Sequence, residues 1–245
     1  MLKINYSKSY CHFSTLNIVR AKVLEDVRDY KPLVIFGPLA SGKTPLINHL
    51  RYHVSKFEYV LPRSCQTIFH DGSVAGRDYH PCDIKEFQSD DVEWLFVEKM
   101  EAPANHPRQS LISGVLASDL LAVDKKDIPI LEMKNLKNVQ KFRDMKILDC
   151  HYAYVAPPSI QELELRIVRN RATQETKQSL EQKLREAKIE LERVRNSEWV
   201  DLVLINEQEE KFLKSSTVKL ESLYNVLKSG SKKKKRSAVE AQMIA

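Results

Sequence analysis

The sequence predicts an α/β fold in which a parallel sheet is flanked by helices, and two observations carry this prediction. Short apolar runs of strand length recur along the chain, and amphipathic helical patterns separate most of them. The first of these runs leads directly into a glycine-containing loop. Strands that alternate with helices favour a parallel sheet, because a parallel connection needs a crossover long enough to hold a helix.

The predicted strands are continuous apolar runs, which are typical of strands buried on both faces. The first is Leu-Val-Ile-Phe at residues 33–36, placed between Pro32 and Gly37. The others lie at residues 58–61, 94–97, 128–133, 152–156 and 200–205.

Three amphipathic helices are predicted from apolar residues at helical spacing. Residues 14–29 carry valines at i, i+4 and i+8, and the other two patterns span residues 46–54 and 180–194. The first pattern precedes the first strand and is therefore expected to pack on the domain that follows.

Composition places the chain among ordinary globular proteins, with 42% hydrophobic and 29% charged residues. No apolar run approaches the roughly 18 residues of a membrane helix, and the first residues lack the apolar segment of a signal peptide. We therefore expect a cytoplasmic protein without a membrane partner. The four cysteines form no C-x-x-C pair, so we expect reduced thiols and no zinc site.

The net charge of +6 is concentrated near the end of the chain. Residues 232–236 (KKKKR) supply five of these charges, which leaves the rest of the chain nearly neutral. Residues 229–245 are predicted to form a disordered basic tail. Such a run binds nucleic acid weakly through charge alone and is also typical of nuclear import signals.

The loop after the first strand reads GPLASGKT at residues 37–44 and matches the P-loop pattern G-x-x-x-x-G-K-[ST] in full. Gly37 and Gly42 allow the backbone to curl around phosphate oxygens, and the following helix presents free N–H groups to the same anion. Lys43 adds a cation for the β- and γ-phosphates, and Thr44 offers a hydroxyl to Mg²⁺. The sequence therefore predicts a site for ATP and Mg²⁺.

Further blocks resemble the guanylate kinase family, in order and over about residues 31–225. They read KPLVIFGPLASGKTPL, GSVAGRDYHPCDIKEF, IPILEMKNLKNV, AYVAPPSIQELELRIVRNRAT, EQKLREAKIEL and WVDLVLIN. The resemblance implies a P-loop NTPase-type parallel sheet flanked by helices, with a small GMP-binding-type insertion and a helical lid. It divides the chain into a helical extension (1–29), a guanylate-kinase-like domain (30–228) and the tail (229–245).

On the nucleotide side the family pattern carries over fully. It implies ATP binding by the P-loop, with Thr44 also at the metal, and catalytic roles for Lys43 and two lid residues. Arg171 occupies the place of a lid arginine, whereas Lys183 replaces a second one and keeps its charge without the bidentate fork. The implied ATP-binding residues are Gly37, Ser41, Gly42, Lys43 and Thr44.

On the acceptor side the pattern is altered. Thr67 and His70 stand where the family places two arginines that grip the GMP phosphate, and Lys134 replaces an aspartate. Losing two charge-assisted contacts of about 1.5–3 kcal/mol each predicts weak GMP binding. Arg63 and Arg77 are interpreted as exposed loop arginines rather than replacements. The acceptor-side residues that match the family, or replace one of its acids conservatively, are Ser64, Tyr79, Glu93 and Glu132.

Three functions remain open at this point. The first is phosphoryl transfer from ATP to GMP or another nucleoside monophosphate. The second is a non-catalytic module that binds nucleotide and contacts a protein partner. The third is nucleic-acid binding through the tail. Lys43 and Arg171 favour the first function, and the losses at Thr67 and His70 favour the second.

Overall fold

The computed structural model describes residues 25–66, 74–89, 91–100, 111–134, 136–171 and 177–228. Most of the predicted N-terminal helix, the positions of Thr67 and His70, and the predicted tail lie outside these residues. Residues 25–27 are helical, and Val27 is fully buried in the core.

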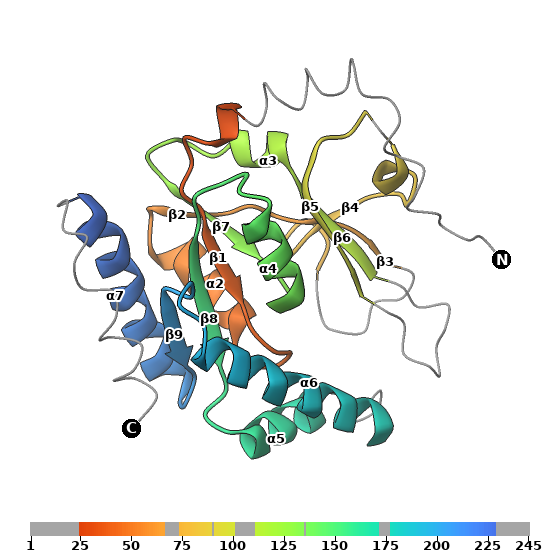
Figure 1. Cartoon of the computed structure of the whole chain (residues 1–245), viewed down its shortest axis with the longest axis vertical. Coiled ribbons are helices and arrows are strands. Elements are labelled where there is room, and N and C mark those ends of the chain that lie inside the picture. Colours follow the sequence, from red (N-terminus) through yellow and green to blue (C-terminus); the bar gives the residue numbers. More distant parts are fainter. Residues whose placement is uncertain are drawn as a thin grey trace.

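A parallel five-stranded sheet forms the centre of the molecule (Figure 1). Parallel pairing joins every pair of neighbours, with Leu33 opposite both Ile130 and His151. In spatial order the strands are β2 (Phe57–Tyr59), β7 (Ile128–Glu132), β1 (Leu33–Phe36), β8 (His151–Ala156) and β9 (Leu202–Ile205).

Alternate residues of β1 enter two separate cores on the two faces of this sheet. Leu33 and Ile35 pack with α2 (Lys43–His53) and α7 (Glu209–Lys228). Val34 and Phe36 pack on the other face with α4 (Leu136–Asp144) and with the end of α6 (Lys177–Arg195). Burial on both faces explains why the strand is a continuous apolar run.

A second, four-stranded sheet stands beside the first and forms the predicted insertion (Figure 1). Its strands, in spatial order, are β4 (His80–Pro81), β3 (Arg63–Gln66), β6 (Leu111–Leu116) and β5 (Trp94–Met100). The 3-10 turn η1 (Glu86–Gln88) and the short α3 (Ala117–Leu121) adjoin it in sequence. The run at residues 94–97 therefore belongs to this sheet and not to the parallel one, which corrects the simple alternation expected from the sequence.

Helices α5 (Ile160–Arg171) and α6 form a hairpin at the edge of the molecule, in the place expected for the lid (Figure 1). Leu163, Ile167 and Ala187 are buried between the two helices and make a small core of their own. In the described part of the chain, no helix combines the length and the apolar character needed to cross a membrane.

Candidate nucleotide-binding site

The P-loop joins the end of β1 to the start of α2 at the carboxyl edge of the parallel sheet. Three residues of this loop have positive φ: Gly37 at 147°, Ala40 at 61° and Gly42 at 108°. These angles turn the backbone sharply between the strand and the helix. The strand, loop and helix that the motif requires are therefore in place.

Both glycines also sit where a side chain does not fit. A Cβ on Gly37 would lie 2.3 Å from the carbonyl oxygen of Val155, and one on Gly42 would lie 2.2 Å from Nδ2 of Asn206. Val155 lies on the neighbouring strand β8, and Asn206 directly follows β9. The loop is thus packed tightly against the ends of the adjacent strands.

Lys43 is the first residue of α2, and its side chain folds back over the loop. Its Nζ donates to the carbonyl oxygens of Gly37 at 2.8 Å and of Pro38 at 2.9 Å. Burial lowers the pKa of Lys43, and the carboxylates of Glu132 and Glu190 oppose that shift. Thr44 follows in the first turn of the helix and is exposed.

Asn206 supports the loop from the end of β9. Its Nδ2 donates to the carbonyl oxygen of Ser41 at 2.9 Å, and its own carbonyl accepts from Arg166 at 2.8 Å. Ser41 Oγ and Asn206 Oδ1 are buried without a hydrogen-bond partner among the described residues. Asn206 is not among the site residues predicted from the sequence, although it ends the WVDLVLIN block that resembles the family.

Three carboxylates from different elements act on the pKa of Lys43, and each of them raises it. Glu132, at the end of β7, accepts a hydrogen bond from the Tyr59 hydroxyl at 3.1 Å. Burial raises the pKa of Glu98 on β5, and burial raises that of Glu190 on α6 to about 7. Glu98 and Glu190 are not among the site residues predicted from the sequence, since neither belongs to the loop motif.

The acceptor-side candidates lie mainly on the second sheet. Ser64 on β3 and Tyr79 just before β4 are both buried. Glu93 precedes β5, and its Oε1 is buried without a hydrogen-bond partner in the described part. Glu132 reaches the same region from the parallel sheet, close to Lys43.

The lid candidates are placed by the α5–α6 hairpin. Arg171 is the last residue of α5, and the structure describes its backbone but not its side chain. Lys183 is half-buried on α6. Arg166 is occupied, since it donates to Glu162 at 2.9 Å as well as to Asn206.

The two arginines considered as replacements on the acceptor side are both bound to carboxylates. Arg63 begins β3 and donates two hydrogen bonds of 3.2 Å to Asp119. Its side chain is 29% exposed, so it is not the exposed loop arginine expected from the sequence. Arg77 is 50% exposed and pairs with Asp78 at 2.6 Å. Both guanidinium groups therefore already have a carboxylate partner.

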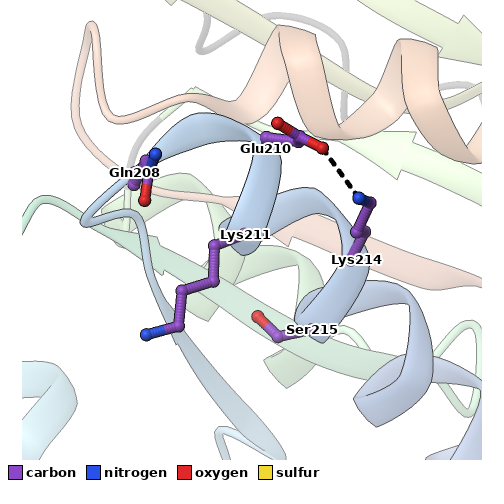
Figure 2. A pocket seen from close by; sticks show the side chains of 5 residues that line it. All are labelled: Gln208, Glu210, Lys211, Lys214 and Ser215. Atoms are coloured by element: carbon purple, nitrogen blue, oxygen red, sulfur yellow. Dashed lines mark hydrogen bonds and ion pairs between the residues drawn. The ribbon is translucent and has the colours of Figure 1, made fainter.

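A hollow of about 390 Å³ lies at the start of α7 (Figure 2). All five residues that line it are exposed, and an i,i+4 ion pair of 2.7 Å joins Glu210 to Lys214. None of the predicted site residues lines this hollow, so it is separate from the P-loop site.

Comparison with known proteins identifies the family. The family model described as guanylate kinase matches residues 29–223. The chain belongs to the guanylate kinase family. It is 31% identical over 185 residues to the guanylate kinase of Schizosaccharomyces pombe, an alignment that covers 75% of this chain and 87% of that protein.

Other members of the guanylate kinase family are more distant. The guanylate kinase of Sus scrofa is 28% identical over 184 residues, with 74% of this chain and 87% of that protein covered. The crystal structure of guanylate kinase from Anaplasma phagocytophilum has a TM-score of 0.52 at 20% identity and covers 84% of this chain and 89% of that one. The second comparison bears on the fold and agrees with the P-loop architecture described above.

Proposed function

We propose that this chain binds ATP through its P-loop and transfers the γ-phosphoryl group to a nucleoside monophosphate, with GMP as a weak acceptor. The observation that carries the proposal is the arrangement of Lys43, whose ammonium lies over the loop carbonyls at 2.8 and 2.9 Å. A phosphate oxygen competes well for these contacts, because it carries a negative charge that attracts the ammonium and a carbonyl oxygen does not.

The residues of the loop suit a triphosphate. The positive φ angles of Gly37 and Gly42 allow the loop to curl, and the N-terminus of α2 favours an anion. Thr44 is exposed in the first helical turn, from which its hydroxyl is available to Mg²⁺. The nucleotide would supply the phosphoryl group and carry Mg²⁺ with it, and Lys43 would stabilise the charge that develops during transfer.

The acceptor side supports a weak GMP site. Thr67 and His70 replace the two arginines of the family pattern, and Arg63 and Arg77 are held by Asp119 and Asp78. This same observation favours a second candidate function, a non-catalytic module that binds nucleotide and contacts a protein partner. The two candidates share the ATP site and differ in turnover and in the protein partner.

A coupled assay of ADP formation with GMP, AMP, CMP and UMP in turn tests the proposal. We expect ADP formation that depends on a monophosphate, and ATP affinity at least about tenfold weaker in Lys43→Ala because a phosphate-directed charge is lost. Lys211→Ala is the matched control, since Lys211 is an exposed lysine in the separate hollow.

Equal ATP binding by wild type and Lys43→Ala in calorimetry would overturn the nucleotide site itself. Normal ATP binding without turnover of any monophosphate would instead favour the non-catalytic module.

A further inference from the structure

Lys134 lies at the border between the P-loop and the second sheet. Glu132 on β7 is in register with Ile35 on β1, and the N–H of Met133 donates to the carbonyl of Ile35 at 3.0 Å. Lys134 is the second residue after the end of β7, next to the point where β1 runs into the loop. The lysine thus leaves the sheet at the edge where the phosphates are expected.

The backbone of Lys134 is held from the other side by Glu98. Both carboxylate oxygens of Glu98 accept from the Lys134 N–H at 3.1 Å, and Oε1 also accepts from Asn138 at 3.0 Å. Glu98 is only 2% exposed and belongs to β5 of the second sheet. This contact ties the two sheets together and fixes the point from which the Lys134 side chain extends.

The ammonium group of Lys134 takes no part in these hydrogen bonds, which come from its backbone N–H. Glu98 binds the backbone of the lysine, and no described carboxylate pairs with its Nζ within the 4.0 Å of an ion pair. The side chain is half-buried, and its positive charge is one of the causes that lower the pKa of Lys43. Two neighbouring cations are stabilised when an anion binds between them.

We propose that Lys134 binds the phosphate of the acceptor monophosphate. This inference rests on the proposed function and names the residue that takes over part of the role of the missing arginines. A lysine presents three donors on a flexible stem and binds phosphate as a point charge. It lies beside the P-loop and not on the 67–70 segment, so the phosphate contact is made from the parallel sheet.

Calorimetry with matched ligands and matched variants tests this role. Wild-type protein loaded with ADP is titrated with GMP, AMP, CMP and UMP, and then with the nucleoside of the monophosphate that binds tightest. We expect Lys134→Met to weaken that monophosphate at least about tenfold, as for the loss of one charge-assisted contact. The affinity for the nucleoside should change less than about twofold, and Lys134→Arg should retain most of the monophosphate affinity.

Lys137→Met is the control, because Lys137 is an exposed lysine three residues further along the chain, in the first turn of α4. Thermal melting of each variant establishes that it is folded. Equal monophosphate affinity in wild type and Lys134→Met would overturn the inference, as would equal losses for nucleoside and monophosphate. A loss confined to ATP, or no binding of any monophosphate to the wild type at millimolar concentration, would overturn it too. In every one of these outcomes, ATP binding by the wild-type protein leaves the nucleotide site of the proposed function standing.

Discussion

Asn206 and Ser41 are 165 residues apart in the chain, yet the side-chain amide of Asn206 donates to the Ser41 carbonyl at 2.9 Å. The same amide nitrogen would lie 2.2 Å from a Cβ on Gly42, so a larger residue at this position would have to displace it. The end of β9 therefore acts as a rigid support for the P-loop. The hydrogen bond therefore connects the loop after β1, the first strand of the sheet in sequence, to the end of β9, the last one.

Asn206→Ala should destabilise the protein and weaken ATP binding. The change leaves the buried Ser41 carbonyl without its donor, which costs about 1–3 kcal/mol in unfolding free energy. Urea unfolding and ATP calorimetry measure the two effects. Asn196→Ala is the control, because its amide makes only an exposed bond to Glu192 within α6. Equal effects of the two changes on ATP affinity would contradict a supporting role for Asn206.

Gly42→Ala should be far more harmful than Gly76→Ala. Both glycines have positive φ, 108° and 80°, so both substitutions introduce backbone strain. At Gly42 the new methyl group also meets Asn206 Nδ2 at 2.2 Å, whereas nothing lies within 4 Å at Gly76. We expect a loss of roughly 1 kcal/mol at Gly76 and at least 1–3 kcal/mol more at Gly42. Thermal unfolding of the two variants measures the difference. Similar losses of stability at both sites would show that the close approach to Asn206 is unimportant.

The parallel sheet could be predicted from the sequence because its strands are buried on both faces. The runs at residues 33–36 and 152–156 contain hardly any residue that is not apolar or aromatic, so their pattern is unambiguous. Strands β3 and β4 read Arg-Ser-Cys-Gln and His-Pro, and no apolar pattern marks them. Their pairing depends on contacts with β6, which lies far away in the sequence.

The candidate site divides in the same way. The P-loop has a local motif because consecutive backbone groups must face one anion, and the sequence predicted its position fully. Glu98, Glu190 and Asn206 come from three separate elements and acquire their roles only when the sheet edge brings them to Lys43 or its loop. A single sequence does not distinguish them from other polar residues of the chain.

Glu190 should make stability depend on pH in the neutral range. Burial raises the pKa of Glu190 from 4.5 to about 7 in the folded protein. Between about pH 4.5 and pH 7 the folded state therefore keeps a proton that the unfolded state has released, and stability falls as the pH rises through this range. Glu190→Gln removes this effect, so its stability relative to wild type should rise by about 1–3 kcal/mol between pH 5 and pH 8.

Urea unfolding at the two pH values measures the change. Glu192→Gln is the matched control, because Glu192 is exposed on the same helix and should give the same difference at both pH values. A difference between Glu190→Gln and wild type that does not vary with pH would show that Glu190 is ionised normally in the folded protein.

Restoring arginines at residues 67 and 70 should strengthen GMP as an acceptor. Thr67→Arg with His70→Arg returns the two guanidinium groups of the family pattern, whereas Arg63 and Arg77 are already paired with Asp119 and Asp78. Each bidentate contact to phosphate contributes about 1.5–3 kcal/mol, so GMP affinity or turnover should rise at least about tenfold. The affinity for guanosine, which lacks the phosphate, should stay the same.

Steady-state kinetics with GMP measures the gain. The Lys43→Ala background, in which turnover should remain low, separates acceptor binding from the ATP site. Wild-type turnover of GMP at the roughly 1–100 s⁻¹ typical of kinases would show that the altered acceptor side already binds GMP well.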